Sequence, residues 1–216
     1  EMADAAFGVF LGALAVQLVT AMTERTRARQ ITKPVLMPLL LLFYWLKADA
    51  PTFLVMLALV LSTMGDIFLL WPGKQGTFIA GLLSFLTAHV LYIVVFAGAA
   101  ARANGLPVWF YLAAIPYLLY CTGLFLALRP HLGPMKAPFV LYSAVIAAMG
   151  LASLLRTPGF SGAGFYMPFI GSLLFMASDS VLAINTFRSK IPRGDVYIMS
   201  TYVTAQVLIV AGMIVS

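Results

Sequence analysis

The sequence predicts an all-α protein, a polytopic membrane bundle of eight transmembrane helices. The chain of 216 residues is 62% hydrophobic and only 9% charged, with a mean hydropathy of +1.01. Soluble domains carry about 25% charged residues, so the outer surface of this chain is expected to face lipid. Apolar runs long enough, or nearly so, to cross a hydrocarbon core of about 30 Å follow one another along the chain. Since backbone groups at that depth must pair internally, and period-2 alternation is absent, the runs are predicted to be helices.

Charged or turn-forming residues separate the eight predicted spans, which cover residues 5–22, 32–46, 53–71, 76–99, 107–128, 137–156, 164–187 and 196–215. The second span is short and contains Pro34 and Pro38, of which Pro34 suits a first helical turn. Turn-like sequences mark the joints at 71–73, 104–107, 157–159 and 192–194. The first span follows acidic Glu1 and Asp4 and no basic region, so it is interpreted as a retained helix and not as a signal peptide.

Basic residues are distributed unevenly over the loops between these spans. One side of the membrane would hold ten of them: Arg25, Arg27, Arg29, Lys33, Lys74, Arg129, Lys136, Arg188, Lys190 and Arg193. The other side would hold three: Lys47, Arg102 and Arg156. By the positive-inside rule the ten are cytoplasmic, and both termini are predicted to be non-cytoplasmic. The net charge of +6 then favours membrane lipid over nucleic acid as a partner, and the lack of long loops favours a bacterial inner membrane over the endoplasmic reticulum.

The chain is interpreted as a single transmembrane domain, 1–216, built from two parallel four-helix repeats with halves at about 1–104 and 105–216. The segment Thr87-Ala88-His89-Val90-Leu91 matches Thr204-Ala205-Gln206-Val207-Leu208. A leucine follows both Asp66 and Asp179 after three residues, and Lys33-Pro34 resembles Lys136-Ala137-Pro138. Three matches in the same order favour duplication over the chance recurrence of small and apolar residues.

Asp66 and Asp179 are the only acidic residues inside predicted spans, where a charge costs several kcal/mol and usually marks a functional site. The alternative is that each aspartate only hydrogen-bonds a neighbouring helix. Both are expected in the cytoplasmic halves of their spans, where other polar side chains converge: Lys33, His89, Tyr92, Tyr142, Tyr202 and Gln206. His89 shares a helix face with Tyr92, as Tyr202 does with Gln206, because residues three or four apart are neighbours on a helix.

Each of these polar side chains also has a purely structural interpretation. His89 could be a satisfied core histidine, and the tyrosines could be interfacial anchors or packing residues. Gln206 could hydrogen-bond between helices, and Lys33 could be one more basic residue of the cytoplasmic side. Cys121, the only cysteine, excludes an intrachain disulfide, and glycines such as Gly65 and Gly171 are expected where helices pack closely.

At these polar residues the sequence resembles the YhhN-like lysoplasmalogenase family of membrane proteins. In the first half the resemblance rests on Lys33-Pro34, Gly65-Asp66 with Leu69, and Gly81, Phe85, His89 and Tyr92. In the second half it rests on Tyr142, Ser178-Asp179 with Leu182-Ala183 and Phe187, and Tyr202 with Ala205-Gln206. It extends from the second predicted span to the eighth, and it implies an eight-helix membrane fold.

The resemblance also implies an ether hydrolase that cleaves the vinyl ether bond of a lysoplasmalogen, a lysophospholipid, into a fatty aldehyde and glycerophosphocholine or glycerophosphoethanolamine. Protonation of the vinyl β-carbon creates an oxocarbenium ion, so the reaction needs a proton donor and a group that stabilises the cation or activates water. Asp66 and Asp179 are predicted to divide these roles, in an order that the sequence leaves open. The supporting side chains would be His89, Tyr92, Tyr142, Tyr202 and Gln206, and Lys33 could hold the lipid phosphate. Neither a metal nor a cofactor is predicted, and the oligomeric state is left open.

Two other classes of protein fit the same pattern. A proton-coupled transporter of a small molecule or lipid also pairs repeats with an intramembrane aspartate in each half. Against a transporter, the polar set is offset to one leaflet, whereas transporter sites are usually at the midplane. A non-catalytic lipid-binding or scaffold protein is the third interpretation, and it predicts that neither aspartate is needed for activity.

Overall fold

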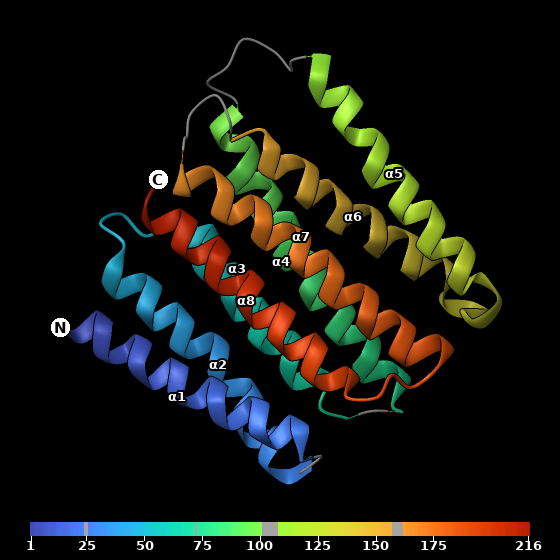
Figure 1. The fold of residues 1–216 in the computed structure, drawn as a ribbon, viewed down its shortest axis with the longest axis horizontal. Helices are drawn as coiled ribbons and strands as arrows, with labels where there is room; N and C mark the ends of the chain where they lie inside the picture. The colour runs from blue at the N-terminus through green and yellow to red at the C-terminus, as the bar shows by residue number, and fades with distance from the viewer. Residues whose placement is uncertain (24–25, 72, 101–107, 157–161) are drawn as a thin grey trace. The chain divides into compact units, whose positions relative to one another are not determined.

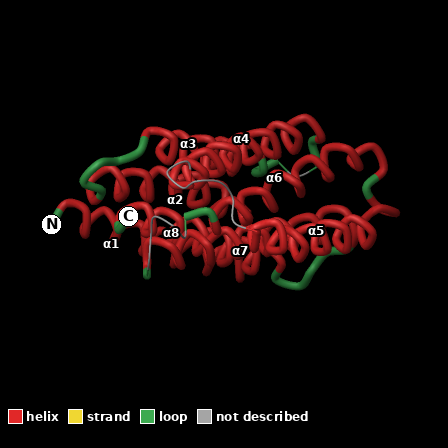
Figure 2. Tube along the Cα trace, turned by 90° about the horizontal axis from the view of Figure 1, so that it is seen from above, coloured by secondary structure: helices red, strands yellow, loops and turns green. Residues whose placement is uncertain are grey.

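The computed structural model describes residues 1–23, 26–71, 73–100, 108–156 and 162–216, and within these ranges every regular element is helical (Figure 1, Figure 2). The α-helices are α1 (Met2–Met22), α2 (Thr26–Lys47), α3 (Phe53–Phe68), α4 (Gln75–Ala100), α5 (Val108–Leu128), α6 (Lys136–Leu154), α7 (Ala163–Ala183) and α8 (Gly194–Ile214). Two 3₁₀ turns, η1 (Arg129–His131) and η2 (Gly133–Met135), connect α5 to α6, and a π-helical turn, η3 (Ile184–Arg188), extends α7. The predicted all-α class is therefore confirmed. The turns predicted at 104–107 and 157–159 lie outside the described residues.

Among the described residues, six helical segments are long and apolar enough to cross a membrane: Met2–Met22, Gln75–Gly98, Val108–His131, Gly133–Leu154, Ala163–Arg188 and Gly194–Ile214. They coincide with six of the predicted spans, and they make the chain an integral membrane protein. The other two predicted spans correspond to α2 and α3. At a rise of 1.5 Å per residue, α3 is about 24 Å long, slightly short of a hydrocarbon core of about 30 Å.

The start of α2 differs from the prediction. Residues 23–31 were expected to be a loop, but α2 begins at Thr26, so the connection to α1 is very short. Arginine, glutamine and lysine are good helix formers, so the polar segment before the apolar run continues the helix instead of breaking it. Pro34 and Pro38 consequently lie inside α2 and not at its first turn.

The chain divides into two compact units. The first contains Glu1–Tyr92 with Met213–Val215, and the second contains Ile93–Gly212 with Ser216. The boundary falls inside α4, and the repeat halves expected at about 1–104 and 105–216 stay a prediction.

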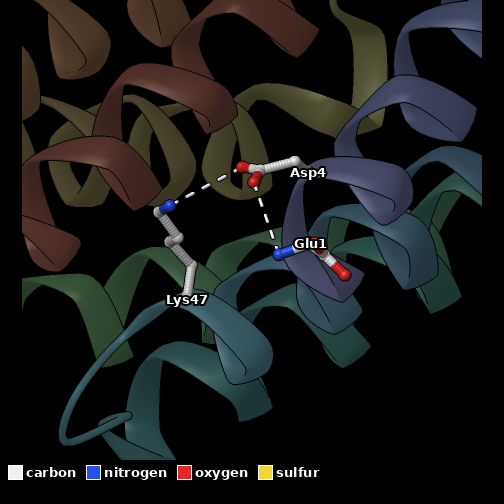
Figure 3. A network of polar contacts seen from close by, with 3 residues as sticks. All are labelled: Glu1, Asp4 and Lys47. Carbon is white, nitrogen blue, oxygen red and sulfur yellow. Dashed lines mark ion pairs between the residues drawn. The ribbon is translucent and has the colours of Figure 1, made fainter.

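In the first unit, α2 packs against both α1 and α3. Figure 3 shows Lys47, the last residue of α2, beside Asp4 in the first turn of α1, with 3.6 Å between the Lys47 ammonium and the Asp4 carboxylate. The amino group of Glu1 is also 3.6 Å from the Asp4 carboxylate. Because these groups are exposed, their pairing contributes only about 0–1 kcal/mol, but it shows that α1 and α2 are antiparallel neighbours.

Glycines bring neighbouring helices close together in both units, as predicted for Gly65 and Gly171. A Cβ atom on Gly65 of α3 would lie 2.5 Å from the ring of Phe85 on α4. On Gly171 of α7 it would lie 2.8 Å from the backbone oxygen of Ala205 on α8. The second contact is the tighter constraint, because a backbone oxygen cannot rotate away as a side chain can.

The substitution Gly171→Ala is therefore expected to destabilise the protein by about 1–3 kcal/mol, because α7 and α8 must separate to admit the methyl group. Thermal unfolding in detergent measures the effect. Gly123→Ala in α5 is the matched control, since a Cβ atom there meets no other atom within 4 Å, and it is expected to leave stability unchanged or slightly raised. Equal melting temperatures for the two variants would contradict the close packing of α7 on α8.

Arg156 was predicted to be one of the charges in the loops, and it does lie beyond the end of α6, but it is not exposed as a loop charge would be. Its side chain is buried just beyond the end of α6, with a residue exposure of only 2%. The guanidinium donates hydrogen bonds to the Gly164 carbonyl oxygen (3.3 Å) and to Ser216 Oγ (2.9 Å), and it lies 5.7 Å from the ring centre of Phe96. These partners replace water around the cation, which is why it can be buried.

Candidate functional site

Asp66 forms a buried ion pair in the first unit. It lies in the last turn of α3, and Lys33 reaches it from the N-terminal half of α2. The Lys33 ammonium is 3.2 Å from Asp66 Oδ1, and the two side chains are 13% and 2% exposed respectively. This distance places a positively charged group next to the carboxyl group, an arrangement that favours the ionised form of Asp66.

The buried face of α4 lies close to the Asp66 segment of α3. The ring of Phe85 contacts Gly65, the residue before Asp66, and His89 follows Phe85 by one helical turn. His89 and Tyr92 are both fully buried in the first unit, as expected for residues that share one face of a helix. Ser62, one turn before Asp66 on α3, is fully buried as well.

Asp179 has a different kind of partner in the second unit. The Tyr142 hydroxyl, on α6, donates a hydrogen bond of 2.6 Å to Asp179 Oδ2, on α7. Tyr142 is 8% exposed, so the hydrogen bond lies between packed helices. A phenol is neutral, so this contact adds a hydrogen bond to the carboxyl group without adding a positive charge.

A second hydroxyl pair adjoins Asp179, and the sequence did not reveal it. The hydroxyl groups of Tyr120, on α5, and Ser180, on α7, are hydrogen-bonded to each other. Both hydroxyl oxygens also lie within hydrogen-bond distance of the backbone oxygen of Met176, at 3.3 Å from Tyr120 and 2.7 Å from Ser180, so two hydroxyl protons serve three contacts. In the sequence, the one feature that could have indicated Tyr120 and Ser180 is that both are hydroxyl residues within otherwise apolar spans, with Ser180 adjacent to Asp179.

Tyr202 and Gln206 lie on the buried face of α8, with residue exposures of 4% and 0%. The Tyr202 ring packs edge to face against Phe175, with 5.3 Å between ring centres, and Phe175 is one helical turn before Asp179 on α7. The predicted shared face of Tyr202 and Gln206 is consistent with their common burial. The contact with Phe175 places Tyr202 near the Asp179 segment of α7.

The structure thus brings together two pairs of predicted site residues, Lys33 with Asp66 and Tyr142 with Asp179. In each unit the aspartate lies on one helix and its partner on the preceding helix. Since Asp66 and Asp179 belong to different units, their joint action stays a prediction. Among the described residues, no three His, Cys, Asp or Glu side chains are grouped as metal ligands would be.

Comparison with known proteins identifies the family. The model of the YhhN family matches residues 28–213, which include both aspartates and all six supporting polar residues. The chain belongs to the YhhN family. The predicted resemblance is therefore confirmed, and the YhhN match begins within α2, so α1 lies outside the matched region.

Curated relatives of this YhhN protein come from mammals and from mycobacteria. Lysoplasmalogenase TMEM86B of Homo sapiens is 36% identical over 170 residues, which cover 77% of this chain and 67% of the relative. Lysoplasmalogenase TMEM86A of Bos taurus is 32% identical over 159 residues, covering 72% of this chain and 62% of the relative. The lysoplasmalogenase of Mycobacterium tuberculosis (strain CDC 1551 / Oshkosh) is 32% identical over 161 residues, covering 72% and 58%. The chain therefore spans less than two thirds of two of these three relatives, and no solved structure matches it significantly.

Proposed function

We propose that this YhhN-family protein is a lysoplasmalogenase, which hydrolyses the vinyl ether bond of a lysoplasmalogen to a fatty aldehyde and glycerophosphocholine or glycerophosphoethanolamine. One observation carries the proposal. Relatives that are named lysoplasmalogenases share 32–37% identity with this chain over 70–80% of its length. The described residues add a carboxyl group within each of two apolar helices, and a carboxyl group can supply the proton that acid-catalysed hydrolysis of a vinyl ether needs.

Asp179 is proposed as the proton donor. Its carboxyl group accepts a hydrogen bond from the Tyr142 hydroxyl, and α7 is an apolar helix, in which ionisation of a carboxyl group is costly. When the carboxyl group is protonated, Oδ2 can accept the Tyr142 hydrogen bond while Oδ1 carries the proton. Transfer of that proton to the vinyl β-carbon breaks the carbon–carbon π bond and leaves an oxocarbenium ion.

Asp66 is proposed as the anion that stabilises this cation and accepts a proton from the attacking water. Its pairing with Lys33 supports the choice, because the neighbouring cation favours the ionised form of the carboxyl group. Water adds to the α-carbon to give a hemiacetal. The hemiacetal collapses to the aldehyde as its hydroxyl proton is transferred to the leaving glycerol oxygen, and Asp66 then loses the proton it accepted while Asp179 gains one, which restores the starting state. Division of roles between a protonated and an ionised carboxyl group is also how glycosidases handle oxocarbenium-like transition states.

The remaining predicted site residues are proposed to support the two carboxyl groups. Tyr142 positions Asp179, while His89, Tyr92, Tyr202 and Gln206 are proposed to orient water or substrate. Lys33 has three N–H donors, so it can contact a lipid phosphate in addition to Asp66.

Aldehyde release by the purified protein tests the proposed function. The full chain in detergent is incubated with a lysoplasmalogen, and free fatty aldehyde is measured over time. The matched control substrate is the saturated alkyl ether of the same chain length and head group, which has no vinyl β-carbon to protonate and should release nothing. A transporter or scaffold would release aldehyde from neither lipid, and that result would refute the proposal.

Tyr142→Phe is expected to lower the turnover number by about tenfold, because Asp179 loses the hydrogen bond that orients it. The Michaelis constant should change little, since the phenol does not contact substrate in this proposal. Tyr111→Phe, at an exposed position on α5, is the matched control and should leave both constants unchanged. If Tyr142→Phe behaves as the control does, the hydrogen bond has no role in turnover.

We also propose that the protein lies in a bacterial inner membrane with both termini non-cytoplasmic. The excess of basic residues in alternate loops supports this topology. Cysteines introduced at Lys74 and at Asp49, in connections on opposite sides of the proposed topology, can be labelled in intact cells with a membrane-impermeant thiol reagent. The Asp49 position should react, and the Lys74 position should react only after lysis.

A further inference from the structure

The second unit contains a partly open cavity of about 420 Å³ between α5 and α7, with one contribution from α6. Its size is within the range of small-molecule binding sites, about 300–1,000 Å³. Apart from two tyrosines its lining is apolar, and the residues that carry the argument are Ala113, Tyr117, Tyr120, Phe169, Leu173 and Ala177. Tyr120 and Leu173 are each 39% exposed, so the cavity opens sideways, where the spans are expected to contact lipid.

Two alanines and a proline leave this space unfilled. Ala113 and Ala177 present only methyl groups to it, and Pro116 on α5 cannot donate a backbone hydrogen bond, which disturbs the regular helix there. We refer to the cavity as the α5–α7 groove.

One end of the α5–α7 groove reaches the Asp179 segment. Met176, which lines the groove, lies three residues before Asp179 and therefore on the same side of α7. The Tyr120 hydroxyl is hydrogen-bonded to Ser180, the residue after Asp179. The other end is apolar, because α5 and α7 run in the same direction and Ala113 therefore lies towards Phe169 (Figure 1). The groove thus has one polar end beside a carboxyl group and one purely apolar end.

We propose that the α5–α7 groove binds the alkenyl chain of the lysoplasmalogen, with the vinyl ether at the Asp179 end and the chain terminus at the Ala113 and Phe169 end. This inference rests on the proposed function and names the part of the site that selects chain length. From Asp179 to Phe169 the distance along α7 is about 15 Å, half of a hydrocarbon core of about 30 Å. A lipid chain occupies one leaflet, so its length suits the groove, and the sideways opening allows entry from the bilayer.

The test compares lysoplasmalogens that share a head group and carry decenyl, tetradecenyl or octadecenyl chains. Ala113→Phe fills the apolar end of the groove, so it should lower kcat/KM for the octadecenyl lipid about tenfold relative to the decenyl lipid, because the shortened groove excludes the end of the longer chain. Phe169→Ala lengthens the groove and should shift the preference the other way. Ala148→Phe, on an exposed face of α6 that does not line the groove, is the matched control and should leave the ratio unchanged.

A binding measurement separates this inference from the proposed function. Saturated octadecyl lysophospholipid, which cannot be cleaved, should raise the melting temperature of the wild-type protein, and Ala113→Phe should remove most of that rise while Ala148→Phe retains it. If the wild type releases no aldehyde but shows this binding pattern, the groove holds a lipid chain and the proposed function is wrong. The inference is overturned if an active enzyme keeps its chain-length profile in both Ala113→Phe and Phe169→Ala, or if all chain lengths are affected equally. A change of oligomeric state in place of the chain-length profile would assign the groove to a second copy and would also overturn it.

Discussion

Asp179→Asn is expected to abolish aldehyde release, with a fall in turnover of at least about 10²-fold, while the protein remains folded. The amide cannot deliver a proton to the vinyl β-carbon, yet it has almost the shape of the carboxyl group. Its oxygen can still accept the hydrogen bond from Tyr142, so the packing of α6 against α7 should persist. Turnover of a lysoplasmalogen and thermal unfolding are measured on the same preparation.

Asp4→Asn is the matched control for Asp179→Asn. Asp4 undergoes the same chemical change, but its side chain is 71% exposed and pairs with Lys47 and the amino group of Glu1 at the surface (Figure 3). It should retain full activity. If Asp179→Asn is as active as Asp4→Asn, Asp179 is not the proton donor and only contributes an interhelical hydrogen bond.

Lys33→Met is expected to destabilise the protein by about 3–5 kcal/mol, because it leaves the buried Asp66 carboxylate without its cation. Methionine is similar in length and suits an apolar helix, so the loss should come from the charge and not from packing. Thermal unfolding in detergent measures it. Lys47→Met is the matched control: it removes the same type of ion pair at an exposed position and should cost about 1 kcal/mol or less.

The double variant Lys33→Met with Asp66→Asn separates stability from catalysis at this ion pair. Replacing both charges by neutral groups of similar size should restore most of the lost stability, because no unpaired charge remains. Turnover should stay abolished, since the proposed stabilising anion is gone. A double variant that regains both stability and activity would show that Asp66 and Lys33 serve only the fold.

Much of the fold was predictable because a membrane imposes simple rules on composition. A chain with few charges and repeated apolar runs can satisfy its backbone in lipid only as helices, and the described helices follow the predicted spans except at the start of α2. The predictions from sequence were wrong where a polar or charged residue can be either part of an exposed loop or part of the folded helices. The polar start of α2 was expected to be a loop, although its residues favour helix, and Arg156 was expected to be a loop charge, although a carbonyl oxygen, a hydroxyl group and an aromatic ring surround it.

The two aspartates of the candidate site could be predicted from the sequence, but the side chains that each of them contacts could not. Asp66 and Asp179 stand out because a carboxyl group inside an apolar helix is rare and costly. Tyr120 and Ser180 were not predicted as site residues, because a single hydroxyl group in a span is common. Only the hydrogen bond between them indicates a polar cluster beside Asp179.

By itself, the sequence determined the all-α membrane class, the number of helices and the presence of an aspartate in each of two apolar helices, because hydropathy and the cost of buried charge are properties of individual segments. Only the tertiary structure decided that Lys33 pairs with Asp66, that Tyr142 donates a hydrogen bond to Asp179, and that an apolar groove reaches the segment of α7 that contains Asp179. The physical reason is that a pairing depends on which faces of neighbouring helices meet and how closely they approach. Glycine contacts such as that of Gly171 with α8 determine how closely two helices approach each other. That distance is known only once the positions of both helices are known.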